Sequence, residues 1–136
     1  MKKQIEEKLI EYFKTIFSQI DEISVKVINA NDFTEDRDSF MVVIGITEQT
    51  RVHYGLNDFE FKLSIVVDTF IEDDEIGYNQ NNISMIIGER MYEYKNLFSE
   101  MFGDLPIVGI VEEPITFNIT DVSHRTELSY LIYTSQ

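Results

Sequence analysis

The chain has 136 residues, of which 25 are acidic and 11 basic, so its formal net charge is −14. This charge repels a phosphate backbone and disfavours specific nucleic-acid binding, and the lack of cysteine excludes disulfides and thiolate metal sites. The length fits a single domain spanning residues 1–136, and a hydrophobic content of 43% predicts a packed core.

The N-terminal part predicts a helix, a strand and a loop. Apolar residues recur at three- and four-residue steps over residues 3–20, which predicts an amphipathic helix. Residues 23–28 alternate and are β-branched, so they predict a strand, and the polar stretch that follows predicts a loop. A longer strand begins near Phe40, and another alternating run covers residues 59–71.

These two longer runs predict an antiparallel β-hairpin that turns at residues 55–58. A register that keeps one face apolar would make the pairs Tyr54–Phe59, Val52–Phe61, Thr50–Leu63, Ile46–Val67 and Ile44–Thr69. Each arm would run for about 13 residues and span about 40 Å, so we expect the tip to project past the core. The tip would then expose an apolar strip, a frequent mark of a protein interface, unless a helix covers the whole ribbon. The strip would consist of Val52, Tyr54, Phe59, Phe61 and Leu63.

The remaining elements complete an α+β fold. The acidic residues Glu72, Asp73, Asp74 and Glu75 lack the ligand spacing of a calcium loop, and we expect a solvated loop there. A second amphipathic helix is predicted over residues 81–101, followed by three short strands within residues 105–134. The predicted order is α-β-β-β-α-β-β-β, a mostly antiparallel sheet with a long central β-hairpin and two amphipathic helices.

The sequence predicts neither an enzyme nor a cofactor or metal site. Asp121, Ser123 and His124 are close in sequence, but a catalytic triad needs side chains that converge in space. The six glycines are scattered, so no phosphate-binding loop is predicted. No segment reaches the roughly 20 apolar residues needed to cross a bilayer, and we expect a soluble protein without a membrane partner.

Three parts of the sequence carry a resemblance to a known family: KKQIEEKLIEYFKTIF, the pair FMVVIGI and FKLSIVVDTFIEDD, and the ending PIVGIVEEPITFNITDVSHRTELSYLIYT. Together they resemble the tail terminator and tail-completion (head-tail joining) proteins of long-tailed bacteriophages. The resemblance spans nearly the whole chain and lies in patterns of helices and strands.

The resemblance implies a structural virion protein of the tail or neck, assembled in the host cytoplasm. Such proteins form rings, typically hexameric, that cap the tail tube and join it to the head connector. The implied partners are other copies of the chain, the tail tube protein and the head-connector or stopper protein, with DNA only passing through the lumen. A neighbouring subunit or the tube would cover the apolar strip, and residues 72–75 would be the acids of the lumen.

Two alternatives remain open at the level of the sequence. An acidic inhibitor or immunity-type protein would neutralise a basic partner such as a nuclease, and it would need an external acidic patch and no ring. A small ligand-binding or enzymatic α+β domain would need a pocket with converging polar groups, which no motif indicates.

Overall fold

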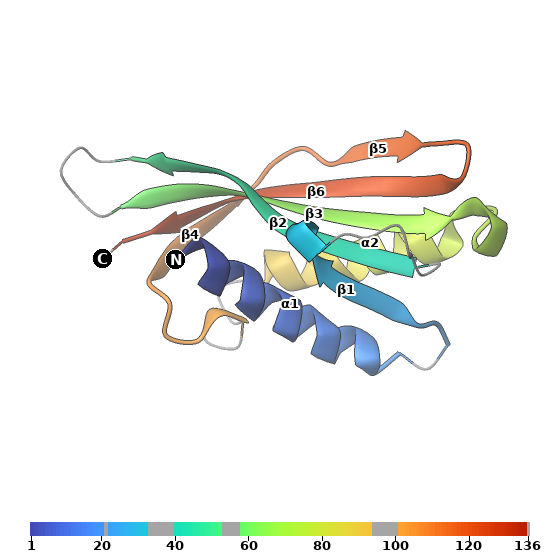
Figure 1. Ribbon diagram of the computed structural model, residues 1–136, viewed down its shortest axis with the longest axis horizontal. Coiled ribbons are helices and arrows are strands. Elements are labelled where there is room, and N and C mark those ends of the chain that lie inside the picture. The colour runs from blue at the N-terminus through green and yellow to red at the C-terminus, as the bar shows by residue number, and fades with distance from the viewer. Residues whose placement is uncertain (21, 33–39, 53–57, 94–100, 136) are drawn as a thin grey trace.

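In the computed structural model, a single β-sheet carries two α-helices on one face (Figure 1). The structure describes residues 1–20, 22–32, 40–52, 58–93 and 101–135. The predicted α+β class and the order α-β-β-β-α-β-β-β are confirmed. The helices and strands are α1 (Lys2–Ser18), β1 (Val25–Asn29), β2 (Phe40–Arg51), β3 (Phe59–Phe70), α2 (Tyr78–Tyr92), β4 (Ile107–Glu112), β5 (Thr116–Ile119) and β6 (Ser123–Thr134).

The sheet has the strand order β1-β2-β3-β6-β4, and β5 also pairs with β6. Only β1 and β2 run parallel among these pairs; the others are antiparallel. The long strand β6 pairs with β5 along residues 124–127 and with β4 along residues 130–134. One edge of the sheet is therefore formed by β1, and the other edge by β4 and β5 together.

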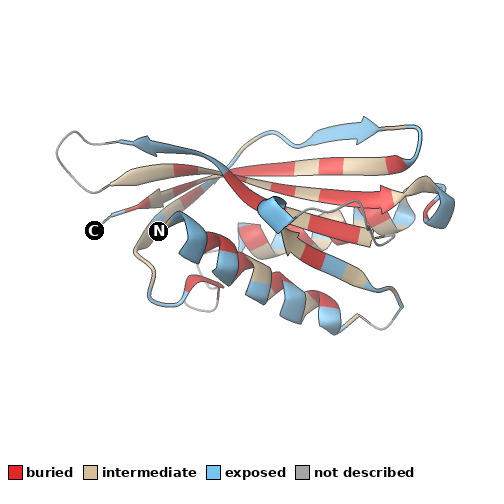
Figure 2. Cartoon of the chain, in the orientation of Figure 1, coloured by how far each residue is buried: buried red, intermediate tan, exposed pale blue. Residues whose placement is uncertain are grey.

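The helices pack on the sheet through the apolar stripes that their periodicity predicted. In α1 the buried apolar residues are Ile5, Leu9, Phe13 and Phe17. In α2 they are Ile83, Ile87 and Met91. Figure 2 shows the buried residues following the inner sides of both helices and the middle strands of the sheet. The predicted continuation of the second helix over residues 94–100 lies outside the described residues.

The central hairpin forms, but its predicted register is wrong. Ile44 lies opposite Ile65 and not Thr69, and Ile46 lies opposite Leu63. A β-bulge between Ile46 and Glu48 then shifts the pairing. Arg51 pairs with Phe59, which already displaces the ladder by three residues from the prediction, and the bulge adds one more. The bulge also reverses which side chains of β2 face the helices beyond it. In the observed register the buried Ile44 lies opposite the buried Ile65, and this apolar cross-strand pair stabilises the hairpin.

The edge of β2 next to this bulge is held by α1. Pairing with β1 ends at Ile44, so on that side the next stretch of β2 has no strand beside it among the described residues, although it pairs with β3 on the other side. There the buried carboxylate of Glu6 accepts a hydrogen bond from the Ile46 N–H at 2.9 Å. This contact supplies the acceptor that a neighbouring strand would otherwise provide.

Candidate association surface

The predicted apolar strip of the hairpin is mostly part of the core. Phe61 and Leu63 are fully buried, so the prediction that they form an exposed interface is wrong. The reason is the position of β3 in the middle of the sheet, where Phe61 lies opposite Ile132 of β6 and joins the core under the helices.

The outer members of the predicted strip have different surroundings. Phe59 is half-buried, and its ring lies 5.6 Å from the guanidinium carbon of Arg51. Val52 is 39% exposed, and its N–H donates to the carbonyl of Asp58 at 3.2 Å. Tyr54 lies outside the described residues. The hairpin therefore offers a small exposed apolar area on its described part.

One of the four predicted lumen acids has a structural role. Asp74 is only 4% exposed, and its carboxylate accepts hydrogen bonds from the N–H groups of Asn79 and Gln80, both at 2.9 Å. It also accepts the Thr69 hydroxyl at 3.0 Å. These bonds join the start of α2 to the end of β3, so the prediction that Asp74 lines a lumen is wrong.

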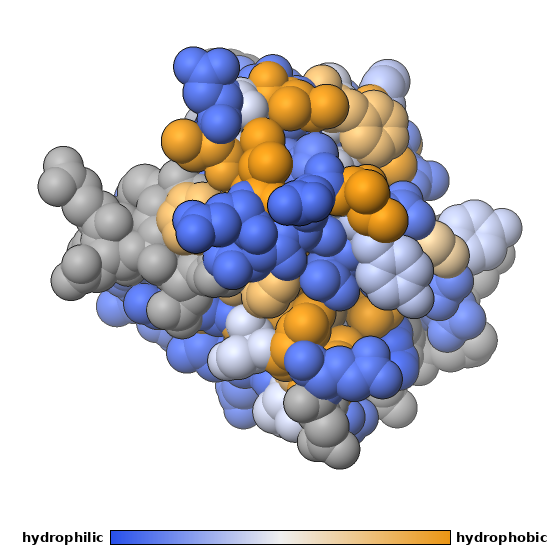
Figure 3. Space-filling model, turned by 90° about the vertical axis from the view of Figure 1, so that its right-hand side faces the viewer, coloured by the Kyte–Doolittle hydropathy of each residue, from blue (hydrophilic) through white to orange (hydrophobic). Residues whose placement is uncertain are grey.

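The other three acids, Glu72, Asp73 and Glu75, are exposed. They lie at one end of the sheet, at and just after the 3-10 turn Ile71–Asp73. Figure 3 looks at this end and shows hydrophilic side chains across its middle, with hydrophobic ones around them. This end is therefore an acidic surface with apolar neighbours.

The neighbouring residues Ser123 and His124 bond to different partners. The Ser123 and Thr120 hydroxyl oxygens lie 3.0 Å apart in the turn that leads into β6. The His124 ring nitrogen Nε2 lies 3.3 Å from the carbonyl oxygen of Glu75. Both contacts hold the end of the sheet together.

Several exposed apolar residues of the described chain lie on β4, on β5 and in the turns beside them. Phe117 is 76% exposed and Ile119 is 71% exposed. We call the following residues the β5 edge strip: Ile115, Phe117, Ile119 and Val122. Residues 114–120 include no charged side chain. Contiguous exposed apolar residues of this kind mark an interaction surface.

The backbone of β5 adds to this surface. β5 pairs with β6 on one side, and no other described strand pairs with its second side. Such an edge presents free N–H and C=O groups that can template another strand. The sequence predicted a strand here, but alternation alone does not distinguish an edge strand from a covered one.

Two hollows adjoin the two edges of the sheet. A groove of about 790 Å³ runs between α1 and β1, with Ile10, Val27 and Ile28 among its lining residues. A smaller hollow of about 290 Å³ lies between the end of α2 and β4, and it is lined by Met91, Tyr92, Ile110, Val111, Glu112 and Tyr130.

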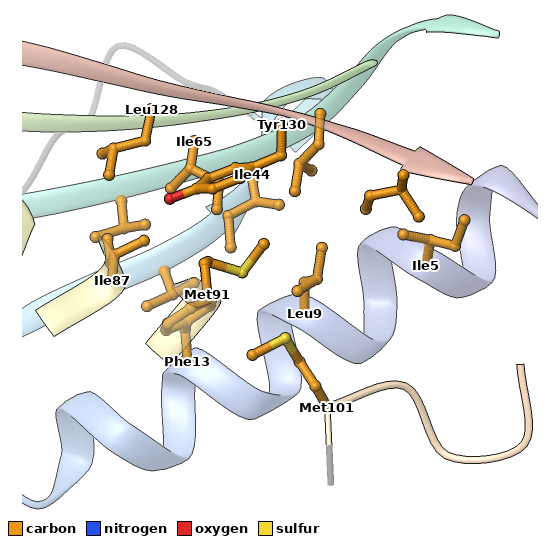
Figure 4. Close-up of a cluster of buried hydrophobic side chains, with 14 of the residues drawn as sticks. Ile5, Leu9, Phe13, Ile44, Ile65, Ile87, Met91, Met101, Leu128 and Tyr130 are labelled. Carbon is orange, nitrogen blue, oxygen red and sulfur yellow. The ribbon is translucent and has the colours of Figure 1, made fainter. Parts of the chain in front are cut away.

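Tyr130 lies at the inner wall of the smaller hollow. It is 2% exposed, and its hydroxyl has no hydrogen-bond partner in the described part of the chain. Figure 4 shows its ring among aliphatic side chains that include Ile65 and Ile87. Burial, followed by the nearby Glu112 carboxylate, raises the pKa of the phenol well above its ordinary value. The phenol therefore stays neutral in the folded protein.

Within the described ranges, no three His, Asp or Glu side chains gather closely enough to hold a metal ion. Nor does any described helix have the length and apolar character needed to cross a bilayer. A single sheet with two helices on one face and an open apolar edge thus defines the protein as an α+β domain. Comparison of the chain with models of known protein families, and with curated protein sequences, finds no match.

Proposed function

We propose that this protein is a structural component of a bacteriophage tail that assembles into a hexameric ring, caps the tail tube and joins it to the head connector. The observation that carries the self-assembly is the β5 edge strip, an exposed apolar surface without charge on a chain of net charge −14. The phage role comes from the resemblance of the sequence to tail terminator proteins. In this proposed role the protein is not an enzyme and uses no cofactor.

The two edges of the sheet favour a ring over a symmetric dimer. One edge is the single strand β1, and the other combines β4 and β5, so the two edges differ in shape and side chains. A contact between unlike surfaces is head-to-tail, and it closes into a ring when the rotation between subunits permits. Exposed acids, including Glu72, Asp73 and Glu75, would repel DNA passing through the lumen.

Light scattering after size exclusion, followed by negative-stain imaging, tests this proposal on the full chain. We expect closed rings with a central hole, either for the protein alone or after addition of polymerising tail tube protein. In the second case tubes should stop growing once the protein is bound. A protein that stays monomeric and leaves tube length unchanged would contradict the proposal.

A second candidate is an acidic inhibitor that neutralises a basic protein. The exposed acids Glu72, Asp73 and Glu75, gathered at one end of the sheet, favour it. It would bind as a monomer through electrostatic attraction, with fast association at low salt. A stable one-to-one complex with a basic nuclease, together with inhibition of that nuclease, would support this candidate.

A further inference from the structure

We infer that copies of this chain join by strand addition: β5 of one copy lies along the free edge of β1 in the next, and Phe117 and Ile119 enter the groove between α1 and β1. This contact rests on the self-assembly proposed above and assigns the two surfaces that meet. The occupant of the groove is therefore a second copy of the chain.

The first support is that each copy has one free edge of each kind. Figure 1 shows β5 along one side of the sheet and β1 along the other, with β2, β3 and β6 between them. Among the described strands, β1 pairs only with β2, and β5 pairs only with β6. Joining β5 to β1 satisfies both edges at once and continues the sheet from one copy to the next.

The second support is that the side chains of both strands point the right way. Phe117 lies opposite Thr126, whose hydroxyl donates to the Gln80 side chain of α2 at 2.8 Å. Phe117 and Ile119, two residues apart, therefore point to the side of the sheet that carries the helices. In β1 the buried Val27 lies opposite Val42 of the core and points to the same side. In a continuous sheet, the two exposed side chains of β5 therefore lie over α1 of the next copy.

The third support is the hollow that would receive them. The groove beside β1 has a volume of about 790 Å³, and its apolar lining includes Ile10, Val27 and Ile28. Ile10 is only half-buried in the single chain. Insertion of Phe117 and Ile119 would cover it, which removes apolar surface from water on each copy.

The charges of the two surfaces are compatible with contact between two acidic copies. The stretch over residues 114–120 is uncharged, so it adds no charge repulsion of its own. The lining of the groove has three lysines, Lys2, Lys3 and Lys14, and four acids, Glu6, Glu7, Glu11 and Asp32. Its charge is therefore nearly balanced, and an uncharged segment of a second copy meets little repulsion there.

Crosslinking tests the contact directly, because the chain contains no cysteine of its own. The double variant Lys26→Cys with Asn118→Cys places one thiol on β1 and one on β5, both exposed and both on the side of the sheet away from the helices. Within one copy these positions are separated by β2, β3 and β6, or about 19 Å at 4.8 Å between strands. A short bifunctional maleimide therefore reports contacts between copies.

We expect the double variant to give a ladder of covalent oligomers, and each single-cysteine variant to stay monomeric on a denaturing gel. Efficient dimer formation by Asn118→Cys alone would show β5 paired with β5 and overturn the inference. Rings or other oligomers that form without a ladder would also overturn it, while leaving the proposed ring intact. A ladder whose species are open filaments would support the contact and contradict the proposed ring.

A substitution at the centre of the strip gives an independent readout. Phe117→Ser should weaken self-association at least tenfold while leaving the circular dichroism spectrum unchanged, because Phe117 is exposed in the single chain. Val108→Ser is the matched control, since Val108 is 63% exposed on β4 and lies outside the proposed contact. Equal effects of the two substitutions on sedimentation would overturn the inference.

Discussion

Asp74 joins β3 to α2 through a buried carboxylate, and its charge is less important than the hydrogen bonds that it accepts. Asp74→Asn keeps one acceptor oxygen and replaces the other by a donor, which then faces a donor of the helix or of Thr69. We expect the free energy of unfolding to fall by about 1–2 kcal/mol.

Glu72→Gln is the matched control for Asp74→Asn, because it removes the same charge from an exposed neighbour in the same acidic segment. It should change the stability by less than about 0.5 kcal/mol. Urea denaturation followed by circular dichroism measures both variants. Equal losses in the two variants would indicate that net charge, and not the hydrogen bonds to Asp74, is the cause.

Because of Tyr130, the free energy of unfolding should depend on pH in the alkaline range. Its pKa is raised in the folded protein by burial and by Glu112, while in the unfolded chain it titrates near its ordinary value of about 10. Below that pH both states hold the proton and the stability is constant. Above it only the unfolded state loses the proton, so the free energy of unfolding falls by up to about 1.4 kcal/mol per pH unit.

Tyr130→Phe should remove this dependence and also the hydroxyl that lacks a partner. At neutral pH we expect the variant to be equally stable or about 1 kcal/mol more stable. Its advantage should grow as the pH rises above about 10. Denaturant unfolding of both proteins across this range measures the difference. If the free energies of unfolding of the two proteins change equally with pH, the role given to the buried phenol is contradicted.

At the scale of elements, the close approach of β2 to the turn after β1 depends on a glycine. A Cβ added at Gly45 would lie 2.8 Å from the Cβ of Ala30, whereas one added at Gly109 of β4 meets only Tyr133 at 4.0 Å. Gly45→Ala should therefore cost about 1–3 kcal/mol through overpacking, and Gly109→Ala should be nearly neutral. Thermal unfolding compares the two. Similar melting temperatures would show that the turn can shift without cost.

The sequence predicted the helices and strands better than it predicted the register of the strands and the burial of their side chains. The stripe of α1 was clear because its apolar spacing has the helical period over the whole helix. The register of β2 and β3 was not predictable, because neither the end of pairing at Arg51 and Phe59 nor the bulge near Thr47 leaves a signature in the alternation. In the same way, Phe61 and Phe117 both sit in alternating runs, but one strand is central in the sheet and the other is at its edge. Topology, and not local pattern, decides which of the two is exposed.

This difference in exposure predicts that replacing phenylalanine by serine has a large effect on stability at one position and a small effect at the other. Phe61→Ser removes a fully buried ring from the core and should cost at least about 3 kcal/mol. Phe117→Ser should leave the free energy of unfolding within about 0.5 kcal/mol of the parent chain, because its ring is exposed. Chemical denaturation under conditions where the protein is monomeric measures both. A large loss for Phe117→Ser would show that the β5 edge strip belongs to the core.

At the scale of the whole molecule, the net charge of −14 opposes contact between copies. Screening of this repulsion depends on the Debye length, which falls from about 30 Å at 0.01 M salt to about 8 Å at 0.15 M. The uncharged β5 edge strip is buried by association at any salt concentration. Added salt should therefore strengthen self-association, because it weakens the long-range repulsion and leaves the apolar contact in place.

The two candidate functions thus differ in the sign of their salt dependence. We expect sedimentation velocity at one fixed protein concentration to show larger species at about 0.15 M salt than at about 0.01 M. Phe117→Ser should stay small at both, since it lacks the apolar contact that remains when repulsion is screened. Capture of a basic partner would respond in the opposite way, because salt screens the attraction on which that complex depends. Self-association that weakens as salt is added would contradict an apolar contact between two acidic copies.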